Sequence, residues 1–157
     1  MTHILSYVED VRAGVKGYGR IPEHQALAYS TEHIVQRALP LPLLNLEEAR
    51  AFIDKVCGIE DIDVPRVERP QYLNKRFEAC ASHDDYFIAL RGSHSPMTLC
   101  HELAHCLTAD GHGFDWRSKF VHLTRTHVSV EHGALLRTLY VRLDLPTDWL
   151  VSHKPLN

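Results

Sequence analysis

The sequence predicts one α+β domain, and three observations support this: its length, the order of its periodic segments and the position of its turn residues. The chain has 157 residues, and a domain usually takes about 100–200. Helical patterns occupy both ends of the chain, and short strand-like segments stand between them, which is the order typical of an α+β fold. We expect a helical extension at 1–20, a core at 21–145 and a tail at 146–157.

Three helices are expected in the N-terminal third. Apolar residues at helical spacing predict the first helix at 4–15, after which glycines interrupt the pattern. Pro22 suits the first turn of a second helix that runs to about residue 39. Asn45 followed by Glu48 resembles a capping box at the start of the third helix, and Gly58 is placed to end it.

The middle of the chain predicts strands, and helices follow them. Candidate strands lie at 64–68, 77–82 and 86–90, and a turn at 84–85 would join the last two as a hairpin. Pro96 can open the next helix, which should run to about residue 109 and stop at Gly111. Another helix is expected at 114–126, and Ser129 can cap a last one that reaches about residue 143.

Composition excludes some classes of protein. The net charge of −3 gives no general reason to expect a nucleic-acid partner. Residues 1–20 lack the basic and apolar regions of a signal peptide, and no stretch approaches the roughly 18 apolar residues of a membrane span. We therefore expect a soluble, cytoplasmic protein with reduced cysteines, and the oligomeric state is left open. The four cysteines are Cys57, Cys80, Cys100 and Cys106.

One motif, at 101–105, predicts a metal-binding site. On a helix, residues i and i+4 share a face with their Cβ atoms about 5–6 Å apart, so His101 and His105 can bind one metal ion. Glu102 lies about 100° further round the helix, beside that ion. The opposite face is apolar, so one helix offers a face for metal and a face for packing.

A third ligand is expected at His112. Catalytic zinc sites usually have three protein ligands and a water. Gly111, with a positive φ angle, can turn the chain back and bring His112 to the metal. Asp110 and Asp115 are weaker candidates, because a turn and a helix cap explain them. Glu102 would then act as the general base that takes a proton from the attacking water.

Other polar residues have simpler explanations. Four residues of the last helices could support the site, although a structural role explains them better: His122, His127, His132 and Tyr140. We assign no role to His83 and His94, which border the hairpin and the following loop. A solvated helix face explains the basic residues of the C-terminal part: Arg117, Lys119, Arg125, Arg137 and Arg142.

The motif at 101–105, followed by His112-Gly113-Phe114, resembles two related groups of zinc peptidases. One is the SprT-like and WLM-type group; the closer one is a family of short metallohydrolases of actinobacteria and their phages, over about residues 24–145. The resemblance implies a minimal zincin fold, with a small mixed sheet packed on the metal helix. It also implies Zn²⁺ held by His101, His105 and His112, with Glu102 as the catalyst. Residues 114–116 read Phe-Asp-Trp where that family commonly has Pro-Glu-Phe, so the position of the packing aromatic is left open.

The resulting hypothesis is a zinc-dependent peptidase with a peptide or protein substrate. Zincins bind extended substrates along an edge strand of the sheet, here 86–90. One alternative is a phage regulator-cleaving peptidase, although residues 131–134 match its second helix poorly. Another is a zinc-stabilised binding or regulatory module without catalysis, which would need a fourth protein ligand. The net acidity argues against a third, a DNA-tethered repair peptidase.

Overall fold

The computed structural model of the chain describes residues 2–70 and 78–148. Their contacts group the chain into two compact units, one comprising 1–40 and 112–157 and the other 41–111. The described residues form six α-helices, one short 3-10 helix and a three-stranded mixed sheet, which confirms the α+β class. None of the described helices combines the length and the hydropathy needed to cross a bilayer.

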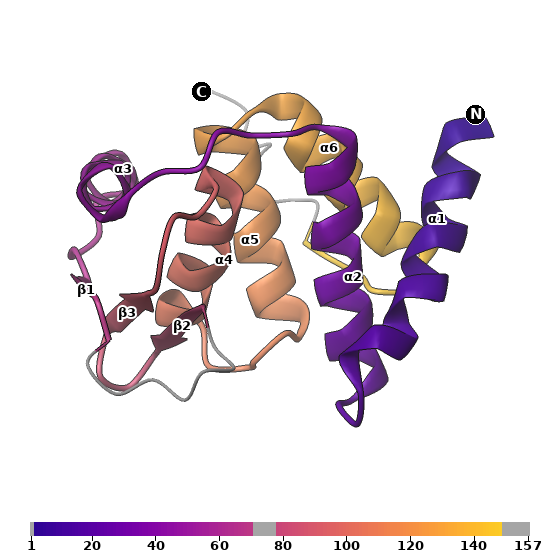
Figure 1. Cartoon of the computed structure of the whole chain (residues 1–157), viewed down its shortest axis with the longest axis horizontal. Helices are drawn as coiled ribbons and strands as arrows, with labels where there is room; N and C mark the ends of the chain where they lie inside the picture. Colours follow the sequence, from indigo (N-terminus) through magenta and orange to yellow (C-terminus); the bar gives the residue numbers. More distant parts are fainter. Residues whose placement is uncertain (1, 71–77, 149–157) are drawn as a thin grey trace, which may run out of the picture. The chain divides into compact units, whose positions relative to one another are not determined.

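The first unit is helical (Figure 1). Its elements are α1 (Thr2–Gly14), η1 (Val15–Tyr18), α2 (Glu23–Ala38), α5 (Phe114–His127) and α6 (Val130–Arg142). Helix α2 packs against α1 and α6, and α5 packs along α6. Ser129 caps α6 by accepting a hydrogen bond from the backbone N–H of His132, as expected. The helices of this unit therefore agree with the sequence pattern to within a few residues.

Close helix approach in the first unit depends on a glycine. A Cβ atom at Gly133 would lie 2.4 Å from the Cβ and 2.7 Å from the Cα of Arg125. Such distances are far below van der Waals contact, so α5 and α6 approach one another at a position where only glycine fits. Large side chains fill the surrounding core, and the largest of them are fully buried: Trp116, Phe120, Leu123, Leu136, Leu139 and Tyr140.

The second unit contains the sheet. Its elements are α3 (Leu46–Glu60), β1 (Arg66–Glu68), β2 (Ala79–Ser82), β3 (Phe87–Leu90) and α4 (Pro96–Leu107). The strand order is β1-β3-β2, with β1 parallel and β2 antiparallel to β3. The expected hairpin is confirmed, and Phe77, at the start of the predicted strand, lies outside the described residues. Helix α4 packs against α3, β2 and β3 (Figure 1).

Two local predictions in this unit are wrong. Gly58 does not end α3, which forms the expected capping box at Asn45 but continues to Glu60 and ends at Asp61, whose φ is 55°. A glycine inside a helix costs only about 1 kcal/mol relative to alanine, and packing of the buried neighbours Val56 and Cys57 outweighs that preference.

The second wrong prediction placed the strand at 86–90 on the edge of the sheet. Strand β3 pairs with β1 on one side and with β2 on the other, so it is the central strand. The physical reason is its parallel pairing with β1, which no local pattern specifies; Phe87–Leu90 itself is a continuous apolar run that is mostly buried. Such runs are typical of strands covered on both faces. Among the described strands, the edges are therefore β1 and β2.

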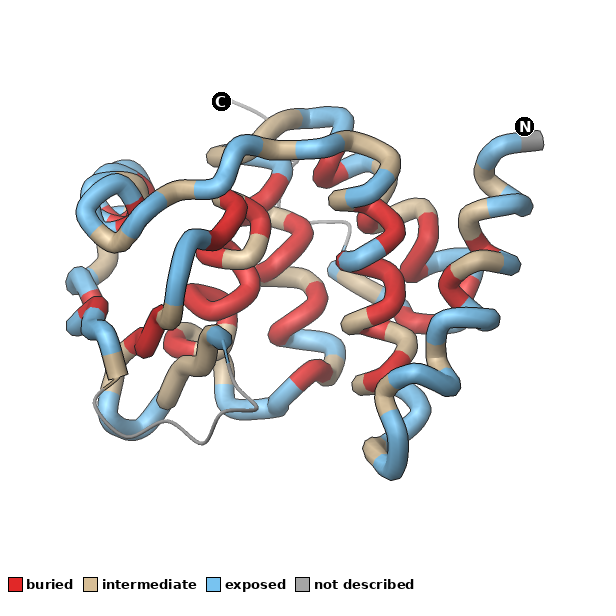
Figure 2. The backbone as a smooth tube through the Cα atoms, in the orientation of Figure 1, coloured by how far each residue is buried: buried red, intermediate tan, exposed pale blue. Residues whose placement is uncertain are grey.

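The helix that carries the motif is largely buried (Figure 2). Most residues of α4 are buried, including the polar side chains of His101 and Glu102, which are 5% and 7% exposed. Burying polar groups costs free energy unless they bind a partner. His101 has such a partner in His105, since their Nε2 atoms lie 3.2 Å apart.

Candidate metal centre

The start of α4 is held by a side-chain cap and by a bridge to a distant segment. The Ser95 hydroxyl accepts a hydrogen bond from the backbone N–H of Thr98 at 3.1 Å, and Pro96 occupies the first turn. Leu44 and His94 exchange two backbone hydrogen bonds of 2.7 and 3.0 Å. The His94 ring donates from Nε2 to the Arg91 carbonyl at 2.7 Å. His94 thus has a structural role, which helps to fix where α4 begins.

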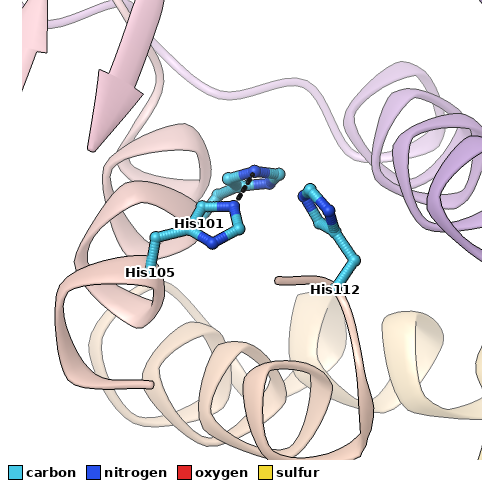
Figure 3. A group of neighbouring side chains, drawn as sticks. All are labelled: His101, His105 and His112. Carbon is cyan, nitrogen blue, oxygen red and sulfur yellow. Dashed lines mark hydrogen bonds between the residues drawn. The ribbon is translucent and has the colours of Figure 1, made fainter. Parts of the chain in front are cut away.

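His101 and His105 lie one turn apart on α4, as the motif predicts. Their Nε2 atoms are 3.2 Å apart, and their ring centroids 4.9 Å apart (Figure 3). Two nitrogens bound to a tetrahedral zinc ion at about 2.0–2.1 Å would be about 3.3 Å apart. The pair is therefore already spaced for one shared metal ion.

The protonation state of His105 also suits metal binding. Burial lowers the pKa of its imidazole, and the neighbouring His101 lowers it further, to about 3. The ring is therefore neutral at physiological pH. Because histidine binds metals only as the neutral imidazole, no proton must leave this ligand first.

His112 joins the pair from the turn that follows α4. The helix ends at Leu107, and Gly111 has a φ of 63°, as predicted for a residue that turns the chain back. The candidate donor atoms of His101, His105 and His112 all lie within 4.8 Å of one another, and the three rings point toward a common space (Figure 3). In the described parts of the chain, neither Asp110 nor Asp115 belongs to this group.

The His112 turn is held by side chains of the first unit. Arg117 donates from Nη1 to the His112 carbonyl at 2.8 Å and from Nε to the Pro146 carbonyl at 3.2 Å. The rings of Tyr29 and Trp116 stand edge-on to the His112 ring, with centroids at 4.7 and 4.5 Å. Arg117 was expected on a solvated face, and this is wrong, because it is only 6% exposed. The sequence around Arg117 does not show that its side chain is buried and hydrogen-bonded to backbone carbonyl groups.

Of the two aromatic residues at 114–116, Trp116 is the one that packs in the core. It is fully buried against His112, whereas Phe114 is 45% exposed. Sequence reasoning did not single out Tyr29, because it lies on α2 and resembles any half-buried helical tyrosine. Its relation to His112 arises only when the chain folds.

Glu102 is a buried residue of α4, the helix that packs against β2 and β3. Burial raises the pKa of the Cys80 thiol, and the negative charge of Glu102 raises it further. The same two causes, in the same order, raise the pKa of Cys106 to about 12. Cys106 donates a weak hydrogen bond to the Phe87 carbonyl at 3.6 Å and is buried in the core. Both thiols are therefore protonated at neutral pH.

The histidines and the tyrosine of the last helices are outside the metal group, among the residues that the structure describes: His122, His127, His132 and Tyr140. His132 has a structural role, since its Nδ1 accepts from the Ser129 hydroxyl at 2.6 Å and its Nε2 donates to the Leu39 carbonyl at 2.8 Å. Tyr140 is fully buried, and burial raises its pKa well above the usual value.

Comparison with protein-family models, with curated proteins and with solved structures finds no match to this chain. The chemistry of the centre must therefore be argued from its residues. Three imidazole nitrogens form a donor set that suits Zn²⁺ and other first-row divalent metals. The spacing of the His101–His105 pair and the neutral state of His105 fit such an ion.

Proposed function

We propose that this chain is a zinc-dependent hydrolase whose substrates are peptides or proteins. The observation that carries the proposal is that His101, His105 and His112 form one group of possible metal ligands. Glu102 follows His101 on the same buried helix, α4. The group has three protein donors among the described residues, which is the number typical of catalytic zinc sites, whereas structural sites have four. A minimal zincin fold is the architecture that we propose for it.

In the proposed reaction, the histidines would bind the metal ion and Glu102 would transfer the proton. A zinc ion at this site would supply a Lewis acid for the substrate carbonyl and would lower the pKa of water to about 7. Glu102 would accept a proton from the attacking water and later donate it to the leaving amine. The three histidines would remain neutral donors throughout, which agrees with the low pKa of His105.

For the substrate we infer an extended segment that lies beside β2. Among the described strands, β2 pairs only with β3, so its other edge faces no described strand. Strand β2 packs on α4, the helix that carries Glu102. A peptide that adds to this edge through main-chain hydrogen bonds would run past the proposed base. The four free cysteines agree with a reducing compartment such as the cytoplasm.

Glu102→Gln tests the proposal, because glutamine has nearly the same shape and cannot take up the proton. We expect zinc content, measured by mass spectrometry of the metal, to stay at the wild-type level. Cleavage of a peptide library should fall by about 10²–10⁴-fold, which is the usual contribution of general acid–base catalysis. The matched control is Glu131→Gln, at an exposed position of α6, which should change neither quantity.

Two results would contradict this. Hydrolysis retained in Glu102→Gln would remove Glu102 from the mechanism. A wild-type protein that binds zinc through the three histidines but cleaves no peptide would favour the alternative of a zinc-stabilised binding module.

A further inference from the structure

A row of aromatic rings runs through the first unit and includes the ring of the third proposed ligand. Successive centroids are 5.7, 4.7, 4.5 and 5.0 Å apart, and the rings belong, in order, to Tyr18, Tyr29, His112, Trp116 and Phe120. These residues come from η1, α2, the His112 turn and α5. The row thus connects the N-terminal segment, which had no assigned role, to His112.

His112 depends on its neighbours for a fixed ring orientation. The glycines on either side, Gly111 and Gly113, have no side chains with which to hold it. Rotation of an imidazole about its second side-chain torsion is broad, so the backbone alone does not select one orientation. The rings of Tyr29 and Trp116 meet the imidazole at 64° and 70°, which is the edge-to-face arrangement that aromatic pairs prefer.

Tyr29 is itself held from two directions. Its ring stacks on Tyr18 with an interplanar angle of 27°. Its hydroxyl accepts a hydrogen bond from Nε2 of Gln25, one turn earlier on α2, at 3.2 Å. A side chain that is fixed at both its ring and its hydroxyl can in turn restrict the ring that it contacts.

We propose that Tyr29 is a positioning residue of the metal centre, which holds the His112 ring in its ligand orientation before a metal ion arrives. The inference rests on the metal site of the proposed function, but it does not require hydrolysis. If the ring is ordered in advance, its rotational freedom is not lost on binding, so the affinity for the ion is higher. Tyr29 acts through His112 and is not itself a ligand.

The test is the zinc dissociation constant of purified full-length variants, measured by competition with a chromophoric chelator. Tyr29→Leu removes the aromatic contact and should weaken zinc binding about tenfold, the lower end of what the loss of an outer-shell partner costs. Tyr29→Phe keeps the ring that contacts His112 and should bind zinc with nearly the wild-type affinity. Tyr7→Leu, at a half-buried tyrosine of α1, is the matched control and should leave the affinity unchanged.

A second background separates positioning from a general loss of structure. If Tyr29 acts through His112, Tyr29→Leu should have no further effect on the residual zinc affinity of a His112→Ala protein. The cobalt-substituted Tyr29→Leu protein should also show a shifted visible absorption spectrum, because the ligand field changes.

Wild-type zinc affinity in Tyr29→Leu, or an equal loss in both backgrounds, would overturn the inference while leaving the metal site intact. Zinc binding that does not depend on His101 and His105 would overturn the site and the inference together. A protein that binds zinc through its histidines but has no peptidase activity would refute only the proposed reaction, because the readout here is affinity.

Discussion

The three histidines come from two regions that are ordered in different ways. On α4, the helical repeat alone places His101 and His105 on one face, and the Ser95 cap fixes where the helix starts. The turn after α4 has no such repeat. There, His112 is held by Arg117 at its carbonyl and by Tyr29 and Trp116 at its ring.

This difference shows which part of a metal site is local and which is tertiary. A pair at i and i+4 forms whenever the helix forms, so its spacing depends on few other residues. A ligand on a glycine-flanked turn is placed by contacts with residues far away in the sequence. The two kinds of ligand should therefore respond differently to substitution.

The largest expected effect comes from deleting the ligands one at a time. His112→Ala leaves the pair with its 3.2 Å spacing, whereas His105→Ala destroys the pair. We expect zinc affinity to fall by more than about 100-fold in both, since loss of a ligand exceeds the 10–100-fold cost of losing an outer-shell partner. The loss should be greater for His105→Ala. Chelator competition at neutral pH measures both constants.

His33→Ala is the control for this series, because His33 is exposed on α2. It should bind zinc like the wild type. Unchanged affinity in His112→Ala would show that the turn contributes no ligand and would reduce the centre to two histidines.

The next effect concerns the tertiary contacts of the turn. Arg117→Met keeps most of the side-chain volume but removes the hydrogen bonds to the His112 and Pro146 carbonyls. Each hydrogen bond to a charged group contributes about 1.5–3 kcal/mol, so loss of the two should cost the zinc-free protein about 3–6 kcal/mol of unfolding free energy. Urea denaturation measures this loss.

Two comparison variants show whether tertiary contacts outweigh local ones. Ser95→Ala removes the cap of α4 and should cost about 1 kcal/mol. Arg125→Met, at an exposed position of α5, should stay within about 0.5 kcal/mol of wild type. A loss in Arg117→Met no larger than that in Ser95→Ala would contradict the view that His112 depends on distant contacts.

The same distinction explains which features could be predicted from the sequence. The capping box at Asn45, the cap at Ser129 and the positive φ of Gly111 are local, and all three are confirmed. The helix pair His101 and His105 belongs to the same class.

The features that were missed are tertiary. Gly58 favoured the end of a helix, but packing of its neighbours continued the helix beyond it. The central position of β3 depends on a parallel partnership with β1 that no local pattern specifies. The burial of Arg117 and the contact of Tyr29 with His112 likewise exist only in the folded chain.

The smallest expected effect isolates the backbone of the turn. Gly111 and Gly92 both have positive φ angles, 63° and 73°, and a Cβ atom at either would meet nothing within 4 Å. Alanine at each position therefore adds only the cost of the left-handed conformation, about 1–2 kcal/mol, and urea denaturation should show similar losses for both variants. Only Gly111 adjoins a proposed ligand, so Gly111→Ala should also weaken zinc binding while Gly92→Ala should not. Equal zinc affinities in the two variants would mean that His112 keeps its place without this turn, and that its tertiary contacts alone are sufficient.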